Sequence, residues 1–408
     1  MSFISYYSRG FSLPEQFCTK YAKELNQKNQ QEVLLSTFDN NRYASRGRMK
    51  TFSLKSFEAI LFTHKVTIEL RAMLHISNNL VIIAAIKSDE KLSTEELKRL
   101  NDNWIPTENI FSYNNTSVHI RNILNYGLAS FLTQVLQKEL SFSDFLTLQS
   151  AQTMQYEDKD IQEIEKIYGY FAIDYKEIYI IPTMYGNTSF FLEDDSLFDL
   201  ELEKFFLDKE SFYIQRNFAY IFSKRELQEK YVYFFAFFNL LRHMKNRLNS
   251  EISYMLDSLA DKDADYTLFL EKATEIKKEY ALHYDEFNNI NIWHDNELFE
   301  LSKYLRSDKG WNIEAELIES KNKLHEFIEL TTEMSKGKLQ TFMDSISILI
   351  GILGIFAIFD LVQILTEEPY KVLPWYLTFI VIIFLLPFLF VIIAKKSNTV
   401  IRFINKYL

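Results

Sequence analysis

The sequence predicts an α+β domain, a long helical stalk and two C-terminal transmembrane helices, in that order along the chain. Three observations lead to this fold class. Residues 1–224 mix short strand-like and helical patterns. Helical periodicity takes over from residue 225, and no proline occurs between that residue and Pro369. Two apolar runs, Ser345–Leu365 and Leu373–Ala394, then follow almost back to back.

Residues 1–224 are interpreted as a cytoplasmic α/β domain. Segments rich in Val, Ile and Leu on either side of Ile76-Ser77-Asn78 predict a β-hairpin, and Ser93 with Glu96 matches a capping box that begins a helix. The other expected elements are helices over Pro14–Gln30, Val118–Leu140 and Asp158–Tyr170 and a strand over Glu177–Pro182.

Residues 225–340 are interpreted as the helical stalk, with helices over 225–258, 263–288 and 295–306. Tyr231–Leu241 is strongly apolar but too short to cross a bilayer, so it predicts a buried helix. A last helix is expected to begin near Trp311 and to continue to Leu365, a length of about 80 Å at about 1.5 Å per residue. A helix of that length needs partners along its sides, and other copies of the chain are the simplest ones.

Residues 341–394 are predicted to form a transmembrane hairpin, because spans 345–365 and 373–394 each have the roughly 20 residues that a crossing requires. Lysines and arginines flank the hairpin, whereas the connecting segment Thr366–Val372 is acidic. The positive-inside rule therefore places both termini, including the basic tail 395–408, in the cytoplasm. The expected location is the inner (plasma) membrane, as a multi-pass protein in contact with the lipid bilayer.

The composition argues against several functions. A net charge of −10 disfavours direct nucleic-acid binding. Only 9 glycines are present, no phosphate-binding glycine motif occurs, and the seven histidines show no metal-ligand spacing. A lone cysteine, Cys18, suits a cytoplasmic domain. We therefore expect no enzyme activity and identify no certain cofactor.

The order of these parts resembles the CorA-like divalent cation transporter superfamily. The closest local match is Leu324–Phe356, where a polar helix runs through Lys338 and Asp344 into an apolar segment rich in Ser, Ile and Gly. The resemblance implies a funnel-shaped homopentamer whose helices line a central pore, with Mg²⁺ or another divalent cation as its ion.

One departure from the family is large. The family carries Gly-Met-Asn at the outer end of its pore helix, whereas this chain has Ile358-Phe359-Asp360-Leu361-Val362. The chain is more similar to a divergent branch that accompanies type III CRISPR antiviral defence. That likeness implies a membrane effector gated by a nucleotide second messenger, such as an S-adenosylmethionine–AMP conjugate.

The helical period identifies a candidate pore-lining stripe, within about 80° of Asp344 at about 100° per residue. Carboxylates at Asp344 would attract cations, and apolar rings further along the helix would exclude water. The alternative is that the glycines only allow close helix packing. The stripe consists of Asp344, Ser347, Gly351, Gly354, Ile358 and Val362.

A basic cluster in Asn40–Lys50 is the candidate ligand site, because arginine side chains suit phosphate and a tyrosine can stack on a base. The alternative is a solvated turn that pairs with the protein's own carboxylates. The candidate residues are Arg42, Tyr43, Arg46, Arg48 and Lys50.

Four aspartates, Asp257, Asp261, Asp263 and Asp265, are the candidate metal ligands. The spacing of Asp261, Asp263 and Asp265 imitates the start of a calcium loop, but Tyr266 stands where that loop needs glycine and Lys272 where it needs its closing glutamate. An acidic helix face is the structural alternative to a regulatory cation site.

These patterns favour a ligand-gated pore of CorA-like architecture. Two alternatives stay open: a magnesium or other divalent cation transporter with an altered filter, and a membrane-anchored enzyme or interaction domain.

Overall fold

The computed structural model describes residues 3–14, 16–27, 49–75, 77–88, 90, 93, 96, 111–148, 156–173, 185–191, 204–207, 210–215, 218–223, 229–259, 266–288 and 296–367. The chain divides into two compact units. Unit 1 comprises residues 1–248 and 279–319, and unit 2 comprises residues 249–278 and 320–408. The dividing points lie inside three helices, so each of these helices contributes to both units.

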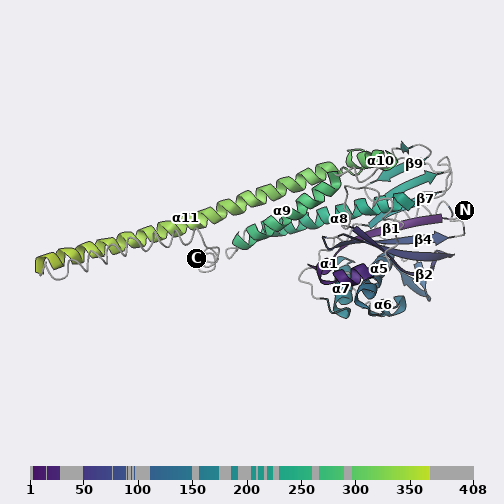
Figure 1. Ribbon diagram of the computed structural model, residues 1–408, viewed down its shortest axis with the longest axis horizontal. Coiled ribbons are helices and arrows are strands. Elements are labelled where there is room, and N and C mark those ends of the chain that lie inside the picture. The colour runs from purple at the N-terminus through teal and green to yellow at the C-terminus, as the bar shows by residue number, and fades with distance from the viewer. Residues whose placement is uncertain are drawn as a thin grey trace. The chain divides into compact units, whose positions relative to one another are not determined.

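Unit 1 is built around a 10-stranded sheet with the order β6-β5-β2-β3-β4-β1-β7-β10-β9-β8 (Figure 1). β7 and β10 run parallel, and the other neighbouring strands pair antiparallel. The strands are β1 (Phe3–Ser12), β2 (Met49–Leu61), β3 (His64–His75), β4 (Asn79–Ser88), β5 (Phe111–Tyr113), β6 (Thr116–Val118), β7 (Tyr185–Phe191), β8 (Lys204–Leu207), β9 (Glu210–Gln215) and β10 (Phe218–Ser223).

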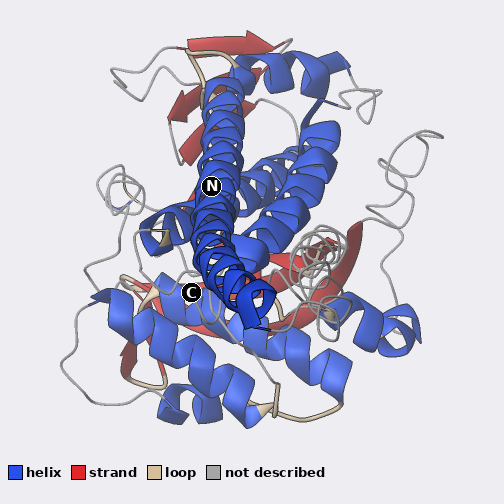
Figure 2. Cartoon of the chain, turned by 90° about the vertical axis from the view of Figure 1, so that its left-hand side faces the viewer, coloured by secondary structure: helices blue, strands red, loops and turns tan. Residues whose placement is uncertain are grey.

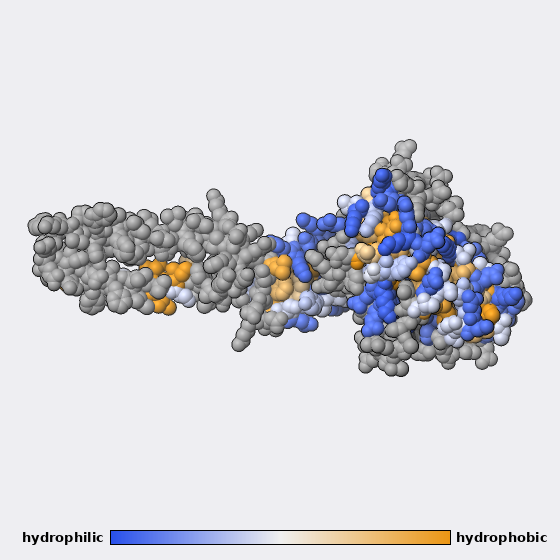
Figure 3. Space-filling model, turned by 90° about the horizontal axis from the view of Figure 1, so that it is seen from below, coloured by the Kyte–Doolittle hydropathy of each residue, from blue (hydrophilic) through white to orange (hydrophobic). Residues whose placement is uncertain are grey.

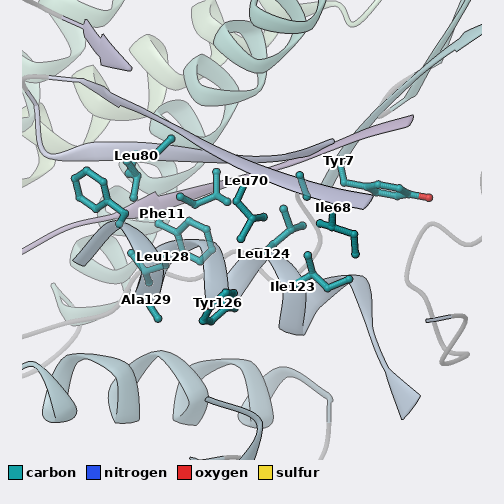
Figure 4. Packing of buried hydrophobic residues seen from close by; sticks show 14 of the residues in the cluster. Tyr7, Phe11, Ile68, Leu70, Leu80, Ile123, Leu124, Tyr126, Leu128 and Ala129 are labelled. Atoms are coloured by element: carbon teal, nitrogen blue, oxygen red, sulfur yellow. The ribbon is translucent and has the colours of Figure 1, made fainter. Parts of the chain in front are cut away.

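One face of the sheet packs on α5 (Ile120–Leu136), which is buried along almost its whole length. Alternate residues of each strand point to this face, as the two-residue period of a strand requires. Figure 4 shows Phe11, Ile68, Leu70 and Leu80 from the strands lying above residues of α5, and Tyr7 belongs to the same buried cluster. Further short helices around this core are α1 (Phe17–Lys20), α2 (Ala22–Gln27), α6 (Phe142–Leu148) and α7 (Tyr156–Tyr170).

The opposite face of β1 packs on the first part of α8 (Glu229–Ser258). Asn239 of α8 donates hydrogen bonds to the backbone oxygen and the hydroxyl of Ser8, at 3.2 and 2.9 Å. A Cβ atom at Gly10 would lie 2.3 Å from Cγ of His243, so the helix approaches the strand closely at this point. Tyr7 and Phe11 alternate with Ser8 and Gly10, and this alternation sends one set to α5 and the other to α8.

A buried polar network lies between β1, α5 and α7. Arg9 Nη1 donates to Asn125 Oδ1 at 2.7 Å, and Asn125 Nδ2 donates to Glu163 Oε2 at 2.7 Å. Asn122 Nδ2 donates to the other oxygen of Glu163 at 3.1 Å, and Arg121 Nη2 lies 3.7 Å from that oxygen. The Glu163 carboxylate therefore connects α7 to α5 and, through Asn125, to the central strand of the sheet.

In the described part of the chain, four helices follow the last strand: α8, α9 (Tyr266–Asn288), α10 (Asn296–Arg306) and α11 (Ile313–Glu367). Figure 2 shows the described helices of the chain in blue and the described strands in red. Within unit 1, Lys245 pairs with Glu316 and Arg247 pairs with Glu279, and these ion pairs tie α8 to α11 and α9. Within unit 2, the rings of Phe269 and Phe327 lie 6.3 Å apart and join α9 to α11.

The predicted membrane-spanning hairpin requires a correction. In the described part of the chain, no helix combines the length and the apolarity that a membrane crossing needs. The first predicted span, 345–365, lies within α11, and the second, 373–394, lies outside the described residues. The predicted fold class with a CorA-like funnel is therefore wrong, and so are the multi-pass inner-membrane location and the description as a membrane ion channel.

The physical reason for this error is that an apolar run of helical length has two uses. It is long and apolar enough for a helix that crosses a bilayer. The same length and apolarity also suit a helix that packs against another protein helix. Length and apolarity alone do not separate these two uses.

Most predicted helices and the hairpin are confirmed. β3 and β4 pair antiparallel from Thr67↔Lys87 to Leu74↔Leu80, and Tyr231–Leu241 is buried within α8. The capping box is also confirmed, because Ser93 N donates to Glu96 Oε2 at 2.8 Å and Glu96 N donates to Ser93 Oγ at 3.2 Å. The last helix is continuous over 55 residues, close to the expected bounds.

Two predicted elements differ in their bounds, and one is outside the described residues. The helix expected over Pro14–Gln30 is divided at Tyr21 into α1 and α2. Val118 belongs to strand β6, so the following helix begins at Ile120. The strand expected over Glu177–Pro182 lies outside the described residues.

Candidate functional site

The candidate site is an exposed stripe on α11, within unit 2. The residues selected from the sequence as one helix face are all in continuous α-helix. Asp344, Ser347, Gly351, Ile358 and Val362 are exposed, and Gly354 is half-buried. The structure thus places these residues on an accessible side of α11, while the role predicted for each of them stays a prediction.

Large apolar side chains on this side are unusually exposed. Ile348, Ile358 and Val362 are 65%, 61% and 55% exposed. Figure 3 shows orange, apolar side chains at the surface of the left-hand part of the chain, where Figure 1 places α11. Large apolar side chains that are this exposed on one side of a helix are typical of an interaction surface.

A subset of the exposed residues follows alternating steps of four and three along the helix. The series begins with Leu330, Met334 and Gly337, continues through Asp344, Ile348 and Gly351, and ends with Ile358 and Val362. Thr341 and Ile355 fall at the two remaining steps, although their side chains lie outside the described set. A mean spacing of about 3.5 residues is the heptad period of helices that supercoil around one another. We call these ten positions the 330–362 stripe.

Small residues leave room along this face. A Cβ atom at Gly337 or Gly351 would meet no atom within 4 Å. Asp344 accepts a hydrogen bond from Gln340 Nε2 at 2.9 Å, one turn earlier on the helix. The stripe therefore combines exposed branched apolar side chains, open glycine positions and one carboxylate.

Most of the predicted ligand-binding cluster lies outside the described residues. This applies to Arg42, Tyr43, Arg46 and Arg48. Lys50 is described: it is half-buried on β2. The positive charge of Lys50 acts to lower the pKa of the Cys18 thiol, but burial outweighs this effect and the pKa of Cys18 is raised.

The predicted metal ligands are likewise only partly described. Asp257 is exposed near the end of α8, and Asp261, Asp263 and Asp265 lie outside the described residues. Among the residues whose positions the structure gives, no group of three or more His, Cys, Asp or Glu side chains is arranged to hold a metal ion. The metal site therefore stays a prediction from the sequence.

Sequence reasoning missed the polar contacts of His243. Its Nε2 lies 3.1 Å from Ser12 Oγ, and Ser12 Oγ donates to Asn79 Oδ1 at 3.2 Å. Burial lowers the pKa of His243 to about 3, and the charges of Arg247 and Arg9 act in the same direction. The imidazole is therefore neutral, and its contact with Ser12 joins α8 to β1.

The sequence carries a partial signal for the stripe but none for the His243 contacts. The four-and-three spacing of the stripe is present in the sequence, but between 345 and 365 nearly every neighbouring residue is also apolar, which hides the period. The His243 contacts join positions that are 231 residues apart, and spacing along the chain does not reveal such a pairing.

Comparisons with known proteins give no relative: no family model, no curated protein and no solved structure matches this chain. The function is therefore argued from the geometry of the chain itself.

Proposed function

We propose that this protein acts as a homo-oligomer that assembles through the 330–362 stripe and responds to a small anionic ligand bound by its sheet-containing unit. The observation that carries the proposal is the exposure of Ile348 and Ile358 at heptad-compatible positions of a 55-residue helix. Covering these side chains removes apolar surface from water, which stabilises an association by about 25 cal/mol for each Å² buried.

A second copy of α11 is the partner that this surface fits best. The 330–362 stripe has a period of about 3.5 residues, so it packs continuously only against a helix of the same period. Each copy of the chain carries such a helix, α11. Ile and Val at the seam insert as knobs between residues of the facing helix, and glycine allows two backbones to approach closely.

Asp344 gives the seam its register. In a symmetric assembly, the Asp344 carboxylates of all copies lie at one level, where like charges repel each other. A single polar residue at such a position lowers stability but favours one alignment of the helices over shifted ones. The level of Asp344 is also where a divalent cation would bind most favourably in the assembled protein.

The first experiment measures assembly of the full chain after Ile348→Glu and Ile358→Glu are introduced together. We expect the parent chain to be oligomeric and the double variant to dissociate, with an apparent Kd raised at least 100-fold, because several glutamates would be buried without partners. Analytical ultracentrifugation over a range of concentrations measures this change.

Ile318→Glu is the matched control for this experiment. Ile318 is the same residue type on the same helix, it is 51% exposed, and it lies outside the four-and-three series. The control is expected to assemble as the parent does. A parent chain that is monomeric at micromolar concentration, or equal weakening by both changes, would contradict assembly through the stripe.

The ligand part of the proposal is tested separately, with Arg46→Ala and Arg48→Ala combined. Two charge-assisted contacts to phosphate each contribute about 1.5–3 kcal/mol, so we expect at least a tenfold weaker affinity for a fluorescent adenosine monophosphate probe. Fluorescence anisotropy measures the affinity, with Lys55→Ala as a control for general loss of positive charge. If the double variant binds the probe as tightly as the parent, the arginine cluster is not the ligand site.

A further inference from the structure

A second polar cluster in unit 1 surrounds the hydroxyl of Tyr231, in the first turn of α8. Tyr231 Oη donates to Glu297 Oε2 of α10 at 3.0 Å, and Lys230 pairs with the same carboxylate. The hydroxyl also interacts with the Glu210 carboxyl, which lies at the start of β9 and is only 5% exposed. Ser223 Oγ of β10 lies 3.4 Å from Glu210 Oε1. The elements α8, α10, β9 and β10 therefore meet at the carboxyl groups of Glu210 and Glu297.

The two carboxyl groups compete for the single proton of the Tyr231 hydroxyl, and a neutral Glu210 removes this competition. A tyrosine hydroxyl has one proton to donate and can also accept a hydrogen bond. When Tyr231 donates to Glu297, a neutral Glu210 can donate its own proton to the Tyr231 oxygen. An ionised Glu210 has no proton to donate, and it would place a second negative charge, nearly buried, beside that of Glu297.

We propose that Glu210 is a proton-operated latch, which holds α10 against β9 and α8 while it is protonated and releases α10 when it ionises. The groups that face Glu210 from each packed element are Ser223 of β10, Lys230 and Tyr231 of α8, and Glu297 of α10. Lys230 is the only cation among them, and Glu297 already binds it.

The electrostatics of the site agree with this assignment. Burial raises the pKa of Glu210 and is the largest effect, and the charge of Glu297 raises it further. The hydrogen bond from Tyr231 and the charge of Lys230 act in the opposite direction but do not cancel the rise. An acid whose pKa is higher in the folded state contributes stability below its unfolded pKa, and this contribution is lost as the pH rises through the folded pKa.

The position of α10 matters because a short turn connects it directly to α11. Trp311 N donates to Leu305 O at 2.9 Å, Asn312 N donates to Ser307 O at 3.2 Å, and Arg306 lies 3.5 Å from Glu314. Release of α10 is therefore expected to loosen the start of α11 within unit 1. This consequence is independent of whether the 330–362 stripe assembles the protein.

The test is hydrogen exchange of the full chain between pH 5 and pH 9, corrected for the intrinsic exchange rate at each pH. In the parent chain, we expect protection of residues 296–306 to fall at least fivefold as the pH rises. Glu210→Gln keeps the site neutral, so its protection should stay near the low-pH value throughout. Glu300→Gln, at an exposed position of α10, should retain the parent's pH profile.

A second variant covers the case in which Glu210→Gln fails to fold. Glu297→Gln removes the neighbouring negative charge, so the midpoint of the protection change should move to lower pH. Identical pH profiles for the parent and Glu210→Gln, or an unshifted midpoint in Glu297→Gln, would overturn the latch.

Discussion

Replacing Glu163 with alanine is expected to lower the free energy of unfolding by about 3–5 kcal/mol, because it leaves buried donors and a nearby guanidinium without their acceptor. Asn122 and Asn125 each donate to this carboxylate, and Arg121 lies 3.7 Å from it. Chemical denaturation monitored by circular dichroism measures the change.

Two further variants distinguish the loss of the Glu163 hydrogen-bond network from the loss of one negative charge. Glu163→Gln retains one acceptor oxygen and should lose roughly half as much stability as the alanine variant. Glu300→Ala removes a glutamate that pairs with Lys303 at 2.9 Å on an exposed face, and it should cost less than about 1 kcal/mol. Equal losses for Glu163→Ala and Glu300→Ala would show that the buried network is not a main source of stability.

Replacing Gly310 with alanine is expected to destabilise the protein by about 3 kcal/mol. The new Cβ atom would lie 2.3 Å from the backbone oxygen of Tyr304 and 2.7 Å from Cα of Leu305. Backbone atoms of α10 cannot move aside as the end of a long side chain can, so the turn between α10 and α11 must distort. Thermal melting followed by circular dichroism measures the loss.

Gly169→Ala is the matched control for this prediction. Gly169 lies within α7, and a Cβ atom there would meet nothing within 4 Å. The same chemical change should therefore stabilise the protein by about 0.5–1 kcal/mol, through the lower entropy of the unfolded chain. A neutral effect of Gly310→Ala would contradict the close approach of the turn.

The two proposals concern different parts of the chain and fail independently. Assembly depends on the 330–362 stripe of unit 2, whereas the Glu210 latch depends on the ends of α8, α10, β9 and β10 in unit 1. A monomeric chain with a pH-dependent α10 would retain the second proposal alone. An oligomer with no pH dependence at α10 would retain only the first.

Local patterns in the sequence were sufficient for the helices and for the β3–β4 hairpin. The capping box at Ser93 and Glu96, the continuous α11 and the buried Tyr231–Leu241 all depend on residues close together along the chain. The period of a helix, the alternation of a strand and the geometry of a cap are decided within a few residues, so composition and spacing reveal them.

The tertiary structure decided what these elements do. Whether the apolar residues of α11 face a bilayer or a protein surface is not a local property, and the transmembrane hairpin was predicted wrongly for that reason. Glu163 meets Arg121, and Tyr231 meets Glu210 and Glu297, only after the sheet has ordered its ten strands and the helices have packed on its two faces. Such contacts join residues far apart in sequence, and their energies depend on burial, which arises only when the whole chain folds.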